Sequence, residues 1–414
     1  MPKPPPFVQQ AEKYKPQMIR FLRDMIAIPS ESAEEGKVIA RIRQEMVATK
    51  AFDKIWTDKM GNLFGQVGKP GKGKKLIAID AHVDTVGVGD RSEWKHDPYQ
   101  GKVADGKVWG RGAGDQEGAI PAMVYAAKIM RDLKLDLSEY CLLLTFTVME
   151  EDCDGLCWQY IVNEGKIRPD AVVVTDSTNC WILRGHRGRM EIGVTAKGKS
   201  CHGSMPEKGD NAIYKIAKIT NEIEKLHKRL KGDKFLGKGT ITVSYVDCKT
   251  PSMCAVPGEA FIHLDRRLTV GDTKASAVRE VKDAIKRAGV KAKVEVLRWP
   301  PELHGPDLRN GKVLPDMVRA GGCAPGVQAA IKAHRDVLGT APTLHRWTFA
   351  ANGVSIAGMF GIPCVRFRPW PRRTSPTPST TPSRSTTWSS APRSTPASVR
   401  PTATWPPIDP TKPR

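Results

Sequence analysis

Up to about Gly185, short apolar segments alternate with longer amphipathic segments, and this alternation restricts the fold more than any other feature of the chain. The apolar runs have the length of strands, and the segments between them carry apolar residues at helical spacing. A hairpin that turns at Gly61 and Asn62 is also indicated. The alternation predicts an α/β layer with a mostly parallel central sheet flanked by helices. The expected strands are Leu76–Asp80, Cys141–Val148 and Ala171–Thr175, and the expected helices are Tyr14–Ile26, Val38–Ala48, Ile120–Leu133 and Leu156–Glu164.

The pattern changes after Gly185, where strand, helix, two strands, helix and strand follow one another. These segments are Met190–Ala196, Asn211–Leu230, Thr240–Val246, Ala260–Leu264, Thr273–Ala288 and Lys291–Leu297. This order is typical of an α+β ferredoxin-like unit. Gly326–Leu338 predicts a further helix, and Thr348–Cys364 predicts strand-like α/β segments. We therefore expect one domain, residues 1–186 and 301–365, interrupted by a lid domain, residues 187–300.

The formal net charge of +21 raises the question of a nucleic-acid partner. Residues 366–414 hold nine Lys and Arg residues and one Asp, so +8 of this charge comes from the C-terminal tail. The other basic residues are spread over loops and helix faces, without the stripe of aromatic and basic side chains that single-strand binders use. We expect a solvated basic surface and no nucleic-acid partner.

The same composition bears on membranes and on the cellular compartment. No apolar run approaches the roughly 18 residues that a membrane-spanning helix needs, so no membrane association is expected. Met1–Gln10 is rich in proline and lacks the apolar core of a signal peptide. Nine cysteines without CxxC pairs favour reduced thiols over a disulfide framework. These features predict a cytoplasmic protein.

Acidic residues and one histidine follow the predicted strands of the first domain. His82 and Asp84 come directly after the strand that ends near Asp80, and their side chains point the same way if the segment is extended. Taken alone, such a histidine is more often a surface residue. Asp176 follows the strand Ala171–Thr175 in the same manner. Because ligands bind at the carboxyl ends of parallel strands, these side chains are candidates for one shared site.

Two further motifs contribute candidate acids. Asp115 lies in the glycine-dense turn Gly110–Gly118, which does not match a phosphate-binding loop. It can point into a site or act as a helix cap, and the turn alone does not decide between the two. Glu150 and Glu151 end an apolar strand, where adjacent acids repel each other unless they are exposed or close to a cation. Imidazole and carboxylate ligands without thiolates suit zinc, manganese or cobalt.

These motifs, in this order, resemble the zinc-dependent deacylase and exopeptidase family that includes acetylornithine deacetylase, succinyl-diaminopimelate desuccinylase, aminoacylase and carboxypeptidase G. The strings GRGAGDQEG, RRLTVGDT and KSCHGSMPEKGDNAIYK are most similar to a subgroup called selenium-metabolism-linked hydrolases. The resemblance covers residues 10–298 and 324–365. It implies a catalytic domain interrupted by a lid and dimerisation domain, a homodimer, and a cis peptide bond between Asp115 and Gln116.

The resemblance also implies two zinc ions per subunit, with cobalt or manganese as possible substitutes. His82 would bind the first ion, Asp84 would orient His82, and Asp176 would complete that site. Asp115 would bridge both ions, and Glu151 would bind the second. The implied reaction is the hydrolysis of a linear amide next to a carboxylate, in an N-acyl amino acid or a dipeptide.

Other residues match the family's catalytic and substrate-binding positions. Glu150 matches the general base, which takes a proton from water and passes it to the departing amine. His202 matches a lid histidine that reaches the site of the partner subunit and stabilises the oxyanion. Asn211 and either Arg266 or Arg267 match lid positions that can hold the carboxylate of a substrate.

The chain departs from the family pattern at its C-terminus, where the histidine that completes the second metal site is missing. If the codons of Arg366–Trp370 are displaced by one base, they allow Gly-Phe-Gly-Pro-Gly, and those of Ser375–Ser389, displaced by two, allow a segment that begins Ala-His-Thr. Residues 300–323 behave in the same way. We interpret residues 300–323 and 366–414 as frameshifted, and the tail as disordered.

Loss of this histidine predicts a defective second metal site and impaired activity. His345 lies in the C-terminal part and is a weak candidate to replace it. An alternative is a catalytically inactive family member that binds one metal ion or none. A remote alternative is a basic protein that binds nucleic acid through its tail.

Overall fold

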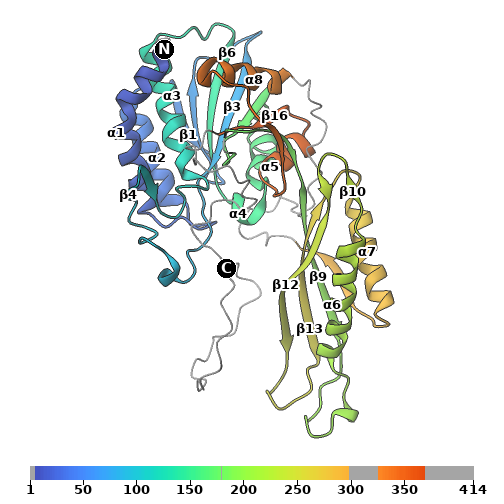
Figure 1. Cartoon of the computed structure of the whole chain (residues 1–414). Coiled ribbons are helices and arrows are strands. Elements are labelled where there is room, and N and C mark those ends of the chain that lie inside the picture. The colour runs from blue at the N-terminus through green and yellow to red at the C-terminus, as the bar shows by residue number, and fades with distance from the viewer. Residues whose placement is uncertain (1–4, 179, 298–324, 369–414) are drawn as a thin grey trace.

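The computed structural model describes residues 5–178, 180–297 and 325–368. In Figure 1 the chain forms a layered domain of helices and sheet, from which a narrower second domain extends. The first domain contains the N-terminal half of the chain and the segment from α8 to β16. The predicted interruption of one domain by another is therefore visible in the path of the chain, while its exact boundaries stay a prediction.

The central sheet has the strand order β1-β2-β6-β3-β7-β16-β8-β15. Its middle is parallel, because β3 pairs in parallel with β6 and β7, and β7 with β16. The pairs β1–β2, β2–β6 and β16–β8 are antiparallel, and β15–β8 is parallel. The predicted α/β class with a mostly parallel sheet is confirmed. The strands are β1 Lys54–Thr57, β2 Leu63–Val67, β3 Lys75–His82, β6 Tyr140–Thr147, β7 Ala171–Val174, β8 Ile182–His186, β15 Leu344–Trp347 and β16 Cys364–Arg366.

Helices cover both faces of this sheet, and the continuous apolar run of β6 explains why. Successive side chains of a strand point to opposite faces. Leu142, Leu144 and Phe146 pack in the core with α1, α2 and α3, whereas Leu143 packs with Trp158 of α5 on the other face. The helices are α1 Pro6–Ile26, α2 Gly36–Thr49, α3 Ile120–Asp132, α4 Glu150–Cys153, α5 Leu156–Asn163 and α8 Pro325–Leu338.

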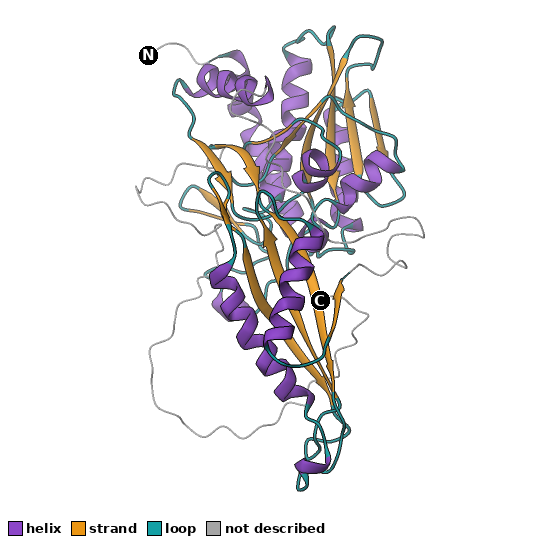
Figure 2. Cartoon of the chain, turned by 90° about the vertical axis from the view of Figure 1, so that its right-hand side faces the viewer, coloured by secondary structure: helices purple, strands orange, loops and turns teal. Residues whose placement is uncertain are grey.

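The lid is a four-stranded antiparallel sheet with the order β12-β13-β9-β14. Along β13, buried and partly exposed residues alternate, and Ala260, Ile262 and Leu264 share a core with the lid helices. Figure 2 shows both helices on one face of the sheet. The predicted α+β lid is confirmed. Its elements are β9 Gly188–Lys197, α6 Ala212–Arg229, β12 Thr240–Lys249, β13 Glu259–Leu268, α7 Lys274–Arg287 and β14 Lys293–Val296.

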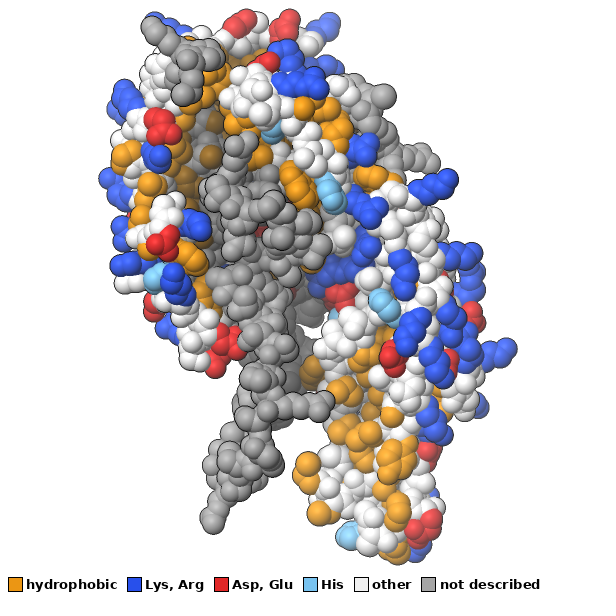
Figure 3. All heavy atoms as spheres, viewed as in Figure 1, with side chains coloured by type: hydrophobic (Ala, Val, Ile, Leu, Met, Phe, Trp, Pro, Cys, Tyr) orange, Lys and Arg blue, Asp and Glu red, His pale blue; other side chains and the backbone are white. Residues whose placement is uncertain are grey.

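Two short antiparallel ribbons lie outside these sheets. The ribbon of β4 Lys102–Ala104 and β5 Lys107–Trp109 lies in the first domain, and β10 Gly232–Asp233 pairs with β11 Gly237–Lys238 in the lid. Lysine and arginine side chains are spread over the molecular face in Figure 3, with acidic side chains among them. None of the helices within the described ranges is long and apolar enough to cross a bilayer.

Within Thr348–Cys364, where strand-like α/β segments are expected, only Cys364 belongs to a strand. A π-helical segment, Val354–Met359, occupies the middle of this range. Val354, Ser355 and Ile356 are buried there, and Ile356 packs in the same core as Trp158. Burial of this apolar group against α5 accounts for the helical turn. A short apolar run in a sequence does not by itself distinguish a buried helical turn from a buried strand.

Candidate metal centre

His82 is the last residue of β3 and lies at the carboxyl edge of the parallel strands. Its side chain is buried. Nδ1 lies 3.0 Å from the backbone oxygen of Asp84 and 3.4 Å from Asp84 Oδ1. If the ring proton is on Nδ1 and is donated to this backbone oxygen, the lone pair of Nε2 is available to bind a cation. Nε2 faces three other acids, at 3.2 Å from Asp115 Oδ1 and 3.8 Å from both Glu150 Oε2 and Asp176 Oδ1.

Asp84 connects the end of β3 to the beginning of α4. Its buried carboxylate accepts hydrogen bonds from the backbone N–H groups of Glu150 at 3.1 Å and Glu151 at 2.9 Å. The hydroxyl of Ser32 donates to the same carboxylate at 2.7 Å. Burial acts to raise the pKa of Asp84, but His82 and these donors outweigh it and lower the pKa. The carboxylate is therefore ionised, and it fixes two sequence motifs relative to each other.

Glu150 and Glu151 begin α4 after Met149, whose φ of 59° turns the backbone sharply at the strand exit. Burial raises the pKa of Glu150 well above its usual range, an effect that the neighbouring His82 opposes and Asp154 reinforces. Burial together with the charge of Asp115 raises the pKa of Glu151 to about 8. Carboxyl groups with raised pKa values can take up and release protons near neutral pH.

Asp115 does not act as a helix cap, the other role that the sequence allowed. The N-cap position of the short helical turn that follows is Gln116, and that of α3 is Ala119. Neither helix has a side-chain hydrogen bond at its N-cap. The peptide bond between Asp115 and Gln116 is cis, as the resemblance implies. The buried Gln116 amide accepts a hydrogen bond from the backbone N–H of His82 at 2.7 Å and donates to Asp176. Asp115 is thus free to face His82.

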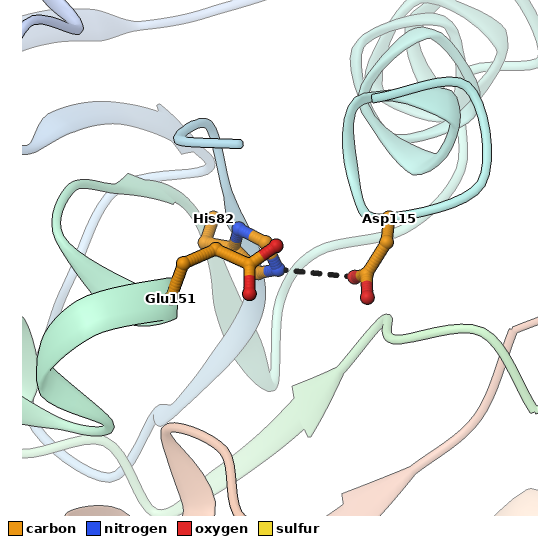
Figure 4. Close-up of side chains that lie close together, drawn as sticks. All are labelled: His82, Asp115 and Glu151. Carbon is orange, nitrogen blue, oxygen red and sulfur yellow. Dashed lines mark hydrogen bonds and ion pairs between the residues drawn. The ribbon is translucent and has the colours of Figure 1, made fainter. Parts of the chain in front are cut away.

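His82, Asp115 and Glu151 converge, and Figure 4 shows their side chains pointing toward one another. One ligand atom from each lies within 4.8 Å of the others. One imidazole and two carboxylates form a donor set that suits a single zinc, manganese or cobalt ion. The set fits one ion. It combines ligands that the resemblance assigns to two different ions.

Asp176 lies beside this group, but its carboxylate pairs with a guanidinium. The partner is Arg366, the last residue of β16, whose side chain is 3% exposed. Burial lowers the pKa of Arg366 to about 10, so the side chain remains charged at neutral pH. The sequence assigned Arg366 to the aberrant tail, whereas here it completes a strand of the sheet. Residues 300–323 and 369–414, the other segments interpreted as frameshifted, lie outside the described residues.

The predicted lid residues have polar partners within the lid itself. His202 is in an exposed loop, with Nδ1 2.7 Å from Ser204 Oγ. Asn211 caps α6, because its side-chain oxygen accepts hydrogen bonds from the backbone N–H groups of Ile213 and Tyr214. The two arginines differ, because Arg266 is buried and pairs with Asp272 and Glu280, while Arg267 is partly exposed and pairs with Asp265. His345 is exposed on β15 and stacks on Trp181, with ring centroids 4.8 Å apart.

The family model for the peptidase dimerisation domain, M20_dimer, matches residues 184–293, which corresponds to the lid. The chain is 46% identical over 372 residues to the protein YgeY of Escherichia coli (strain K12), covering 87% of this chain and 89% of the relative. It is 30% identical over 216 residues to a probable succinyl-diaminopimelate desuccinylase of Staphylococcus epidermidis, covering 51% of this chain and 52% of that protein.

Solved structures show the same fold. An M20 family metallo-carboxypeptidase, Sso-CP2 from Sulfolobus solfataricus, superposes with a TM-score of 0.66 at 19% identity, covering 85% of this chain and 91% of that one. The YXEP protein of Bacillus subtilis, described as a dinuclear metal binding peptidase, has a TM-score of 0.57 at 14% identity and coverages of 86% and 89%. This chain belongs to the M20 family of metallo-deacylases and exopeptidases. The inferred resemblance to the deacylase and exopeptidase family is confirmed, and so is the expected metal-dependent hydrolase class.

Proposed function

We propose that this M20 family chain hydrolyses a linear amide next to a carboxylate, in an N-acyl amino acid or a dipeptide, with zinc as the cation. Cobalt or manganese would suit the same ligands. The observation that carries the proposal is the convergence of His82, Asp115 and Glu151 next to the buried acid Glu150. A divalent cation held by the three ligands would polarise an amide carbonyl and lower the pKa of water.

Glu150 is the group that moves protons in this proposal. Its Oε2 lies 3.8 Å from His82 Nε2, so it borders the place where the three ligand atoms meet. Burial raises the pKa of Glu150, so this carboxylate takes up a proton more readily than a free glutamate does. It can therefore take a proton from the attacking water and return it to the departing amine. Asp84 keeps His82 and α4 in place during both transfers through its backbone and side-chain hydrogen bonds.

The lid would supply substrate recognition. We propose that Arg267 or Asn211 binds the substrate carboxylate, and that His202 stabilises the oxyanion in the site of a second subunit. Arg266 is the weaker candidate of the arginine pair, since two acids already occupy its guanidinium. The match of residues 184–293 to a dimerisation domain supports a homodimer. The buried thiols of Cys141, Cys157 and Cys364 suit a reducing compartment, and we place the protein in the cytoplasm.

The test compares Glu150→Gln and Glu151→Gln with the unaltered chain, using hydrolysis of a panel of N-acyl amino acids and dipeptides. Glu150→Gln should keep the bound metal and lose hydrolysis by a factor of about 10²–10⁴. Glu151→Gln should lose the metal itself, measured by elemental analysis after dialysis. Glu164→Gln, an exposed glutamate at the end of α5, is the matched control and should change neither. Full hydrolysis by Glu150→Gln would contradict the assignment of the base.

A second candidate function is a family member that binds one ion and has little or no hydrolytic activity. The pairing of Asp176 with Arg366 favours it, because this pairing engages a carboxylate that the family pattern assigns to a metal. The two candidates separate in the same assay. Metal bound at one equivalent with no turnover on any substrate of the panel would support the inactive form.

A further inference from the structure

The side chain of Arg366 reaches into the acidic cluster from the middle of the sheet. Its backbone lies between β7 and β8, opposite Val174 and Leu183. Its guanidinium pairs with Asp176 and lies 5.0 Å from the ring centroid of Trp347. Among the described residues, Nε and Nη1 of this buried group have no hydrogen-bond partner. Because only part of the hydrogen-bonding capacity of this guanidinium is used, its attraction to the carboxylate of Asp176 is the main interaction that holds it in this buried position.

A second guanidinium from the same segment also lies beside the cluster. Arg368 is buried, and its Nη1 donates to the backbone oxygen of Gly114 at 2.8 Å and to Ser177 Oγ at 3.3 Å. It therefore approaches the residues that precede Asp115 and follow Asp176. A Cβ at Gly118 would collide with the backbone oxygen of Ala113 and with this guanidinium, so a glycine at this position leaves room for both.

Charge balance explains why cations gather at this point. The members of the cluster lie around one histidine, His82, and are Asp84, Asp115, Glu150, Glu151 and Asp176. Three of these acids, Asp84, Glu150 and Asp176, are buried. Acids gathered around one point can ionise together only when positive charge compensates them. Two guanidinium groups together carry the same charge as one divalent cation, and neither can leave the site.

We propose that Arg366 is a built-in cation of the M20-type centre, so that this chain holds one divalent ion instead of two. The ion lies on His82, Asp115 and Glu151, while Asp176 is engaged by the guanidinium. This inference rests on the proposed metal-dependent function. It differs from that function in the number of ions, which is two in the dinuclear relative from Bacillus subtilis.

The test is the number of Co²⁺ ions bound per full-length chain, measured by equilibrium dialysis with elemental analysis. The unaltered chain should bind one ion. Arg366→Gly, or Arg366→Gln if the glycine variant does not fold, should free Asp176 and add a second, weaker equivalent. Arg366→Lys keeps the positive charge and should remain at one. Circular dichroism establishes that each variant is folded.

Asp176→Asn provides the complementary arm of the experiment. In the unaltered chain this substitution should leave the first ion in place, because Asp176 does not bind it. In the Arg366→Gly background it should remove the second equivalent. Loss of the first ion on Asp176→Asn, two tight ions in the unaltered chain, or one ion in both Arg366→Gly and Arg366→Gln would each overturn the inference. Absence of Co²⁺ from every variant would instead refute the proposed metal-dependent function.

Discussion

Replacing Asp84 with asparagine separates the two roles that the structure gives to this carboxylate. An asparagine offers one oxygen where the aspartate offers two. If that oxygen keeps the bonds from Ser32 and the backbone N–H of Glu151, the N–H of Glu150 loses its acceptor. A buried donor left without a partner costs about 1–3 kcal/mol. Asp84→Asn should therefore lower the free energy of unfolding by about that amount, measured by urea denaturation.

The effect on metal affinity should be small, because the ring of His82 is held mainly by the backbone of residue 84. Nδ1 lies 3.0 Å from the backbone oxygen of Asp84, a hydrogen-bonding distance, and 3.4 Å from its carboxylate. Loss of a residue that orients a metal-binding histidine typically lowers metal affinity about 10- to 100-fold. Since the backbone acceptor remains, we expect the lower end, about tenfold, measured by competition with a chelator.

Asp80→Asn is the matched control, because Asp80 is a buried acid on β3, two residues before His82. Its carboxylate accepts hydrogen bonds from Thr145 at 2.7 Å and Asn352 at 2.9 Å, not from His82. This control should lower stability without changing metal affinity. A loss of affinity beyond 100-fold for Asp84→Asn with unchanged stability would refute the reasoning, since the carboxylate would then be what orients His82.

Two further predictions follow from the same region. Metal affinity should rise with pH and level off above about pH 8. The ion must displace protons from Glu151, whose pKa is about 8, and from His82, whose pKa the surrounding acids raise despite burial. Chelator competition between pH 6 and 9 measures this affinity, and a flat profile would contradict the prediction. Asn352→Ala should lower the free energy of unfolding by about 2–4 kcal/mol in urea titrations. The substitution removes the acceptor of the Gly155 N–H and the donor to the buried carboxylate of Asp80. The control Asn163→Ala, at an exposed position, should change the free energy of unfolding by under about 0.5 kcal/mol.

The sequence predicts the parts of this molecule that depend on local periodicity. The apolar run Cys141–Val148 indicates a strand buried on both faces, and β6 has α1–α3 on one face and α5 on the other. Polar residues that directly follow such strands meet at one edge of a parallel sheet. That rule assigns His82 and Asp176 to one site, and in the folded chain Nε2 of His82 lies 3.8 Å from Oδ1 of Asp176.

Features that depend on contacts between distant segments are not predictable in this way. Arg366 reads as one more basic residue of the tail, because nothing near it in the sequence indicates an acidic partner. Its role follows from the position of β16 between β7 and β8, which only the folded sheet defines. The amide of Gln116 connects His82 to Asp176 for a similar reason. The sequence did offer one indication of this role, because Gln116 directly follows the candidate ligand Asp115 in the glycine-dense turn.

The contrast between Asp176 and Glu151 shows what determines the chemistry of this centre. Both acids leave the carboxyl edge of the sheet beside His82, so position alone makes each a ligand candidate. Asp176 has a guanidinium next to it. Glu151 has no such partner among the causes of its pKa shift: burial and then the charge of Asp115 raise its pKa to about 8. An acid that is already paired gains little from a metal ion, and an acid whose negative charge is unfavourable gains much. The cation should therefore bind on the side of Glu151, and the number of ions depends on whether Arg366 stays in place.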